Sequence, residues 1–412
     1  MTVTFALRRT AIAAMAGGLM LAPASAPAVA ADPVRIAALL PMTGALAEYG
    51  KSARNGIELA VAEINAAGGV LDGRMLEVIT GDTQTNPQSG VAAAQQLVSV
   101  NRVVGIVGPM ASGVTIPVAT TVVAPAGIPL ISPSATAPTI TTLADRDFVF
   151  RTTPHDALQG VVLGDIAKEA GLASVAVVYV NNDYGKSLAD AFAARYAAIG
   201  GKVTASIAYE EKQASYRGEL QRAARGKPDG LVLIAYPGDG IPIIRQSLEE
   251  GFFARFVFSD GMKSTEMIQA IGAGPLEGMV GTAPQAVADA PSAVRFRMAY
   301  EAKFGELPPR PYIDGSYDAV YLLALAIEAA GSTDGTRMRD VLRRVASAPG
   351  DVVGPGDWAK AKALIRAGKD IDYAGAAGSQ DFDRAGDVPG TFGVWQVKRG
   401  KIETLRIVEP KS

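Results

Sequence analysis

The chain has 412 residues, 49% hydrophobic and 19% charged, a composition typical of globular proteins that excludes a disordered or fibrous chain. Its 39 basic and 41 acidic residues leave a formal net charge of −2, without the basic stripe expected of a nucleic-acid-binding protein. The absence of cysteine excludes disulfides, thiol catalysis and thiolate metal sites, and a single histidine argues against a zinc site or a histidine-based catalytic triad.

Residues 1–31 have the pattern of a secretory signal peptide. Arg8 and Arg9 form a positive start, an apolar run over 11–21 follows, and small residues offer a cleavage site near Ala30 or Ala31. The apolar run is too short for an ordinary membrane span. We therefore expect an exported, periplasmic protein, by Sec or twin-arginine export, with an uncleaved anchor as the alternative.

From Val34 onward, strand and helix patterns alternate. The near-continuous apolar run 34–40 is typical of a strand buried on both faces. A helix is predicted over 47–67, ending at two glycines, and the Asn86-Pro87 pair favours the start of another over 87–100. Further strands are predicted over 75–80, 103–108, 128–131 and 148–151.

The same cycle then restarts. Helices are predicted over 156–170, 185–199, 216–226 and 238–250, and strands over 175–180, 202–209, 231–235 and 256–258. Two such runs predict an α/β fold with two doubly wound parallel-sheet lobes. No eightfold period is present, so a barrel is the less favoured interpretation.

The end of the chain has a different pattern. Helices are predicted over 291–304, 313–330 and 335–347, followed by a looser stretch over 350–380 and a terminal hairpin of strands 393–397 and 402–408.

Polar side chains follow several predicted strands. These residues are Ser112, Ser134, Thr136, Tyr184, Tyr236 and Asp260. In an open parallel sheet, ligands bind outside the carboxyl ends of the strands. Such residues also serve as plain helix caps or turn residues, and that reading stays open for each of them. His155 is interpreted as a partly exposed residue at a helix start rather than a general base.

The predicted site is asymmetric between the lobes. The first lobe offers hydroxyls beside helix N-termini, which suit a carboxylate. The second lobe offers Asp260, which suits an ammonium group, and tyrosines offer apolar walls with a polar tip. A zwitterion with a modest side chain fits this pattern.

Several segments together resemble the periplasmic leucine/isoleucine/valine-binding proteins, the solute receptors of ABC importers with the type I periplasmic binding fold. They are PVRIAALLPMTGALAEYGKSARNGIELAVAEINAAGGVLDGR (33–74), VGPMASG (107–113), GIPLISPSATAP (127–138), FRTTP (150–154) and NNDYGKSLADAF (181–192). The resemblance covers nearly the whole chain after residue 31.

The resemblance implies roles for eight residues. Ser112 and Thr136 match positions that hold the ligand carboxylate, the backbone carbonyl of Ser134 matches an ammonium contact, and Asp260 matches the acid that completes the ammonium site. Pocket-lining aromatic positions are matched by Tyr49, Tyr184, Tyr236 and Tyr312. It also implies three crossings between the lobes, with lobe one at 32–154 and 284–366 and lobe two at 155–283 and 367–412.

The sequence departs from the family at three places. Position 134 is serine where some relatives have alanine, and Asp260 is one methylene shorter than the glutamate of some relatives. Residues 355–379, with Trp358 and Tyr373, are longer than in the shortest relatives.

We therefore expect a monomeric, non-enzymatic receptor, without cofactor or metal, that captures a branched-chain or related amino acid by hinged closure and presents it to an inner-membrane ABC permease. The resemblance leaves amides, urea and aromatic acids open as ligands, and a signalling receptor open as the partner. An amidase or carbohydrase is disfavoured by the lack of histidine and cysteine. A repressor of this fold would need DNA-binding helices where the signal segment stands.

Overall fold

The computed structural model describes residues 1–7 and 32–410, and residues 32–410 belong to one compact unit. The expected apolar run of the signal peptide and its cleavage site near Ala30 or Ala31 lie outside the described residues. Within the described ranges, we find no helix with the length and apolar character needed to span a membrane.

The first lobe is built on a parallel five-stranded sheet with the strand order β2-β1-β3-β4-β5. These strands are β1 (Val34–Leu40), β2 (Leu76–Asp82), β3 (Ile106–Val107), β4 (Leu130–Ser132) and β5 (Val149–Arg151). Its early helices are α1 (Ala47–Ala66), α2 (Pro87–Ser99), α3 (Ser112–Val118), a π-helical turn (Ala119–Val123) and α4 (Ala124–Ala126). The Asn86 side chain caps α2 by accepting a hydrogen bond from Ser89 N at 3.0 Å, which confirms the predicted start.

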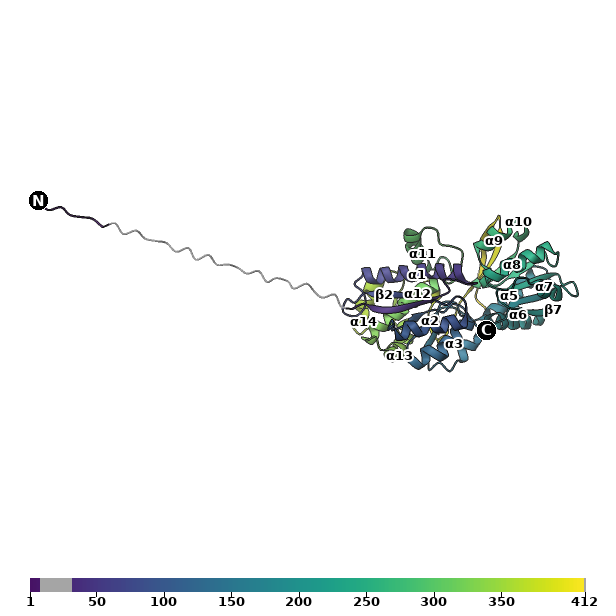
Figure 1. Cartoon of the computed structure of the whole chain (residues 1–412), viewed down its shortest axis with the longest axis horizontal. Coiled ribbons are helices and arrows are strands. Elements are labelled where there is room, and N and C mark those ends of the chain that lie inside the picture. The colour runs from purple at the N-terminus through teal and green to yellow at the C-terminus, as the bar shows by residue number, and fades with distance from the viewer. Residues whose placement is uncertain (8–31, 411–412) are drawn as a thin grey trace. The chain divides into compact units, whose positions relative to one another are not determined.

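Helices from late in the sequence complete this lobe. They are α11 (Pro291–Phe304), α12 (Ile313–Ala330), α13 (Gly335–Ala346) and α14 (Trp358–Arg366). Helix α12 packs against α1, α13 and α14, and α14 also contacts α1; Figure 1 shows these late helices in the same half of the molecule as α1, α2 and β2. Nearly every residue of α12 is buried, so this helix lies in the core of the lobe.

The second lobe is built on a seven-stranded sheet with the order β15-β14-β10-β9-β8-β6-β7. These strands are β6 (Ser174–Val180), β7 (Lys202–Tyr209), β8 (Gly230–Ile234), β9 (Phe256–Phe258), β10 (Val280–Pro284), β14 (Phe392–Lys398) and β15 (Lys401–Val408). The five strands β6, β7, β8, β9 and β10 are parallel to one another. The terminal hairpin of β14 and β15 pairs with β10 in the antiparallel direction. The helices are α5 (Asp156–Glu169), α6 (Asp183–Ala198), α7 (Arg217–Ala223), α8 (Pro237–Glu249), α9 (Thr265–Ile271) and α10 (Ala273–Leu276).

The stretch 350–380 is more regular than its sequence suggests. It contains α14 and a small sheet of β11 (Asp351–Val353), β12 (Ile371–Gly375) and β13 (Gly378–Ser379). Strand β12 packs on α12 and α13, and the buried Tyr373 hydroxyl donates to Asp318 of α12 at 2.8 Å. Trp358 Nε1 donates to the Gly69 carbonyl at 3.0 Å.

These contacts tie the small sheet to lobe one. The boundary expected at 366/367 would separate β12 from the strand and helices that it contacts, so we propose instead that the last crossing lies between β13 and β14. The first two boundaries stay predictions, near β5 and β10.

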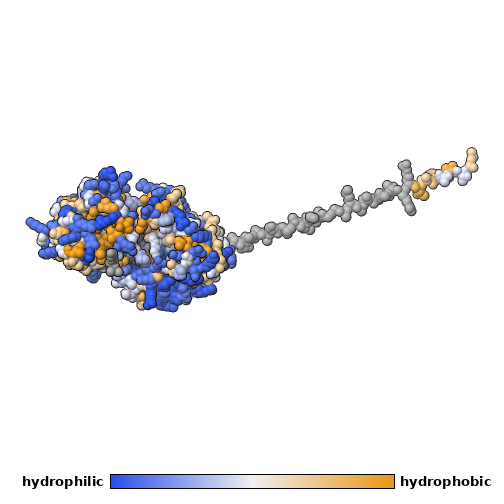
Figure 2. All heavy atoms as spheres, turned by 180° about the vertical axis from the view of Figure 1, so that it is seen from behind, coloured by the Kyte–Doolittle hydropathy of each residue, from blue (hydrophilic) through white to orange (hydrophobic). Residues whose placement is uncertain are grey.

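Many predicted elements agree closely with the structure. The strands 34–40, 202–209 and 256–258 and the helices 291–304 and 313–330 have the predicted bounds. The strand predicted over 103–108 is reduced to β3, while β10 and α9 were not predicted. Figure 2 shows one face of the molecule, largely hydrophilic, with hydrophobic residues gathered toward its middle.

Candidate functional site

The candidate site lies where segments after strand ends from the two lobes meet. Ser112 begins α3 shortly after β3, Tyr236 immediately precedes α8, and Asp260 begins a short 3-10 helix (Asp260–Met262) after β9. This is the edge at which an open parallel sheet binds ligands. Tyr312 comes from lobe one, just before α12, in a left-handed conformation with φ of 78°.

A cavity between the lobes brings together seven of the eight predicted residues. It is lined by Leu46, Tyr49, Met110, Ser112, Ser134, Tyr184, Tyr236, Asp260, Gly261 and Tyr312. Its volume of about 20 Å³ holds little more than a water molecule. A solute therefore enters only when the lobes part or the lining side chains move.

Thr136 is the predicted residue that does not line this cavity. It is fully buried, and its Oγ1 atom has no hydrogen-bond partner among the described residues. Its backbone carbonyl accepts a hydrogen bond from Asp156 N at 2.9 Å, across the boundary expected between the lobes. Its carboxylate-binding role stays a prediction.

Asp260 is the polar centre of the cavity. Its Oδ1 atom accepts hydrogen bonds from the Tyr184 hydroxyl at 2.6 Å and from Gln159 Nε2 at 3.0 Å, while Oδ2 accepts one from the Tyr312 hydroxyl at 2.5 Å. Asp260 is only 4% exposed, and burial raises the pKa of its carboxyl, although these donors favour the ionised form. Tyr312 belongs to lobe one, so Asp260 is shared between the lobes.

The four tyrosines form the walls. Tyr184 and Tyr236 stack with ring centroids 5.5 Å apart, and Tyr49 and Tyr312 are tilted at 6.4 Å. The Tyr49 hydroxyl crosses to lobe two and donates to the Asp260 carbonyl at 2.8 Å. Burial raises the pKa of all four hydroxyls, which stay protonated and can act as donors.

Lobe one contributes two serines to the cavity. Ser112 Oγ accepts a hydrogen bond from Ala137 N at 3.1 Å, which leaves its own O–H available to a ligand. The Ser134 hydroxyl instead donates to the Met110 carbonyl at 2.9 Å. In α3, the Val114 and Thr115 N–H groups donate to the Ala111 carbonyl at 3.0 and 2.9 Å, so the Ser112 hydroxyl and the first two N–H groups of the helix are what this side offers to an anion.

Sequence reasoning missed Asp156, the first residue of α5. It is fully buried, its Oδ2 atom accepts a hydrogen bond from the Ser187 hydroxyl at 2.8 Å, and its Oδ1 atom has no partner in the described part of the chain. Burial, together with the nearby Asp260 carboxylate, raises the pKa of Asp156 to about 7. An acid in the first turn of a helix looks like ordinary dipole compensation, so its sequence position carried no functional signal.

Gln159, one turn further along α5, was also missed. Its Nε2 atom joins Asp260 to the Thr282 hydroxyl of β10 at 3.0 and 3.1 Å, and its Oε1 atom has no partner among the residues described. Gln159 thus fixes the Asp260 carboxylate relative to β10, the strand near which the chain is expected to cross back into lobe one.

His155 sits at the N-cap position of α5 and is partly exposed, as predicted. Burial and the nearby Arg151 lower its pKa. No group of three or more metal-binding side chains occurs among the residues that the structure describes.

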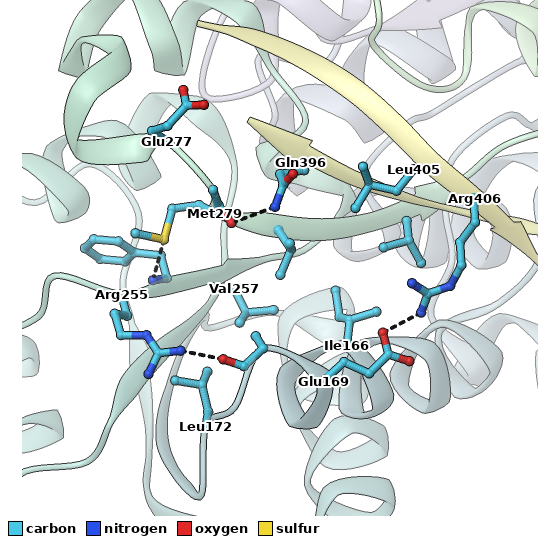
Figure 3. A pocket seen from close by; sticks show the side chains of 15 residues that line it. Ile166, Glu169, Leu172, Arg255, Val257, Glu277, Met279, Gln396, Leu405 and Arg406 are labelled. Atoms are coloured by element: carbon cyan, nitrogen blue, oxygen red, sulfur yellow. Dashed lines mark hydrogen bonds and ion pairs between the residues drawn. The ribbon is translucent and has the colours of Figure 1, made fainter. Parts of the chain in front are cut away.

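A second, wider hollow of about 400 Å³ lies on lobe two and is shown in Figure 3. The ion pair of Glu169 with Arg406 borders it, and none of the predicted site residues lines it. It is therefore separate from the candidate site.

Comparison with known proteins assigns the chain to a family. The sequence profile of the periplasmic binding protein family matches residues 33–369. A chemotactic signal transduction substrate-binding protein, BasB of Halobacterium salinarum, is 28% identical over 92% of this chain and 91% of its own length. A leucine-, isoleucine-, valine-, threonine- and alanine-binding protein of Pseudomonas aeruginosa is 31% identical over 76% of this chain and 83% of its own.

Solved structures agree with this assignment. The crystal structure of a leucine-binding protein from Thermotoga maritima has a TM-score of 0.78 and 26% identity, and the match covers 92% of this chain and 99% of that one. The two-lobed α/β architecture predicted from the sequence is therefore the type I periplasmic binding fold. With this fold and a family profile that spans most of its length, the chain belongs to the periplasmic binding proteins, which bind solutes and are not enzymes.

Proposed function

We propose that the protein captures a small α-amino acid between its lobes and presents it to an ABC permease of the inner membrane. One observation carries the choice of ligand: two buried carboxyl groups, Asp156 and Asp260, lie close enough to raise the pKa of Asp156. Burying two carboxylates without a cation is unfavourable, and an ammonium group neutralises this pair.

The other end of the ligand is a carboxylate. The free O–H of Ser112 and the first N–H groups of α3 belong to lobe one, and Ser112 lines the same cavity as Asp260 of lobe two. Leu46 and Met110, together with the tyrosine rings, offer an apolar wall for a modest side chain. A branched-chain or similarly small amino acid satisfies both ends.

Capture requires motion about the hinge. The carboxylate docks first on lobe one, and closure then brings Asp260 and Tyr184 of lobe two onto the ammonium end. Only the closed form makes both sets of contacts, so the ligand shifts the equilibrium toward it. The permease then recognises this closed form.

Two alternatives keep the same fold. The first is a sensor that feeds a signalling receptor, favoured by the chemotactic relative from Halobacterium salinarum. The second is a receptor for an aromatic acid, an amide or urea. These ligands lack an ammonium group, which would leave the Asp156–Asp260 pair without a cation.

A thermal-shift screen of the purified chain tests the proposal. The panel contains leucine, isoleucine, valine, threonine, alanine, benzoate, acetamide and urea. A ligand present at 100 times its dissociation constant adds about 2.7 kcal/mol of stability, which is a readily measured shift. The proposal expects shifts from amino acids alone. A shift confined to benzoate, acetamide or urea would overturn the ligand class and leave the fold assignment intact.

A further inference from the structure

The four tyrosines of the ligand cavity do not use their hydroxyl groups alike. Three of the hydroxyls donate to Asp260, through its carboxylate or its backbone carbonyl, and they belong to Tyr49, Tyr184 and Tyr312. The fourth hydroxyl, that of Tyr236, has the side chain of Asn182 as its hydrogen-bond partner, 3.2 Å away. Tyr236 therefore differs from the other three in what its hydroxyl can offer a ligand.

Asn182 fixes the direction of this hydrogen bond. It is the N-cap of α6, and its Oδ1 atom accepts a hydrogen bond from Gly185 N at 3.0 Å. Because the amide oxygen is committed to the helix, the Nδ2 atom is the one that faces the Tyr236 hydroxyl. An amide nitrogen only donates, so the Tyr236 oxygen accepts this bond and keeps its own proton for another partner.

That proton has no acceptor among the residues that the structure describes. Tyr236 is 4% exposed and lines the ligand cavity, so a ligand in that cavity is within its reach. Burial raises the pKa of the hydroxyl, which keeps the O–H intact. A buried donor without an acceptor is unfavourable, and an acceptor atom on a bound ligand removes that penalty.

The Tyr236 hydroxyl lies away from the ammonium end of the site. The rings of Tyr184 and Tyr236 are stacked, with centroids 5.5 Å apart and an interplanar angle of 12°. Tyr184 lies in the first turn of α6, and its hydroxyl reaches Asp260. The Tyr236 hydroxyl instead meets Asn182, immediately before that helix. The two hydroxyls therefore lie toward opposite ends of the Tyr184 side chain.

The ligand carboxylate has other donors, on lobe one. The Ser112 hydroxyl and the first two N–H groups of α3 are proposed to hold it. The ring of Tyr236 belongs to the wall that is proposed to contact the ligand side chain. The side chain is thus the part of the ligand left to meet the Tyr236 proton.

We propose that Tyr236 determines specificity, and that its O–H selects amino acids whose side chain carries an oxygen acceptor, such as threonine, over the aliphatic isostere valine. This inference rests on the amino-acid ligand proposed above. Valine has a methyl group where threonine has its hydroxyl, so size alone does not separate them. With valine the buried O–H stays unpaired, and a site built around a hydrogen bond rejects the analogue that cannot make it.

Calorimetric titration of the purified chain with L-threonine and L-valine measures the preference. We expect threonine to bind about tenfold more tightly, which is the weight of one hydrogen bond. Tyr236→Phe should weaken threonine binding and bring the ratio of the two affinities close to one. Tyr209→Phe is the matched control and should keep the wild-type ratio. It removes a buried lobe-two hydroxyl that also lacks a partner in the described part of the chain and does not line the cavity.

A second variant leaves Tyr236 in place. In Asn182→Asp, one carboxylate oxygen can still cap α6, and the other accepts the Tyr236 proton. The threonine preference should then be lost, as in Tyr236→Phe. A general loosening of the site would lower both affinities and keep their ratio, so the ratio separates the two explanations.

Tighter binding of valine than of threonine by the wild-type protein would overturn the inference. So would an equal loss of both affinities in Tyr236→Phe, which would assign the hydroxyl to the carboxylate that both ligands share. Binding of leucine without binding of threonine would overturn it and leave the proposed function intact. If only ammonium-free acids bind, the proposed function fails, and the ratio for 3-hydroxybutyrate and 3-methylbutyrate, which differ in the same way, decides the role of Tyr236.

Discussion

Arg310 of lobe one and Glu266 of lobe two form a bidentate ion pair, with Arg310 Nη2 at 2.5 Å from both carboxylate oxygens. The guanidinium also lies over the ring of Tyr49, 5.4 Å from its centroid. Tyr49 is a wall of the ligand cavity, and its hydroxyl reaches the Asp260 carbonyl. The Arg310 side chain therefore links closure of the lobes to the position of Tyr49, which lines the ligand cavity.

Glu266→Gln should weaken ligand binding although Glu266 lies outside the ligand cavity. Loss of the charge-assisted pair removes support that exists only when the lobes meet, so we expect about tenfold weaker leucine binding, equivalent to roughly 1.4 kcal/mol. Isothermal titration measures this affinity. Asp147→Asn is the matched control, because it removes a bidentate pair with Arg343 inside lobe one. Equal losses in both variants would refute a role in closure.

Gly238→Ala should act as a wedge between the lobes. Gly238 N donates to the Ala45 carbonyl at 3.2 Å across the cleft, and a Cβ atom at position 238 would lie 2.8 Å from Ala45 Cα. This clash exists only in the closed arrangement, so ligand affinity should fall while the unfolding midpoint of the free protein stays near wild type. Gly218→Ala is the control, because Gly218 is also the second residue of a lobe-two helix and its Cβ would meet nothing closer than 3.8 Å. If Gly238→Ala binds leucine with wild-type affinity, the contact between Gly238 and Ala45 does not belong to the closed, ligand-binding form.

Asp260→Asn should abolish amino-acid capture. The amide keeps the size of the side chain but removes the charge that faces the ammonium group, and an uncompensated buried charge costs about 3–5 kcal/mol. We expect leucine affinity to drop by at least about 100-fold in calorimetry. Asp239→Asn removes another buried carboxylate of lobe two, one that does not line the ligand cavity, and should bind leucine normally. Retained binding in Asp260→Asn would remove the role assigned to Asp260.

The raised pKa of Asp156 predicts a pH dependence with a definite sign. In the folded, ligand-free protein burial and the Asp260 carboxylate raise the pKa of this carboxyl to about 7, from its ordinary value of 3.8. Between these values the folded state binds the extra proton, so the stability of the free protein falls as pH rises toward 7. The ammonium ligand prefers the ionised carboxylate, so leucine affinity should rise over the same window. Asp156→Asn should flatten the affinity profile between pH 5.5 and 8, and an unchanged slope would show that another group titrates.

The regular elements were predictable because their sequences satisfy simple rules. The run Val34–Leu40 is continuously apolar because both faces of the strand are buried, and Asn86 caps α2 with its own side chain. Strand β10 was missed because its sequence, Val-Gly-Thr-Ala-Pro, is short and ends in a proline that breaks strand patterns. The contact that attaches the small sheet to α12 could not be predicted from local patterns, because Asp318 lies 55 residues before its partner Tyr373.

The site was predictable in part for a related reason. Ser112, Tyr236 and Asp260 follow strand ends, which sequence patterns reveal directly. Asp156 and Gln159 are ordinary helix residues in sequence, and only the packing of α5 in the folded chain brings them close to Asp260. Arg310 and Glu266 carry no local pattern, because their ion pair joins residues 44 positions apart in the sequence.

Side-by-side calorimetric titration of the purified chain with L-leucine and 4-methylpentanoate tests the central claim most directly. The two compounds share a carboxylate and an isobutyl side chain, and only leucine carries the ammonium group that Asp156 and Asp260 are proposed to hold. We predict one-to-one binding of leucine and no measurable binding of 4-methylpentanoate at the same concentrations. Equal binding of both compounds, or binding of 4-methylpentanoate alone, would contradict the account.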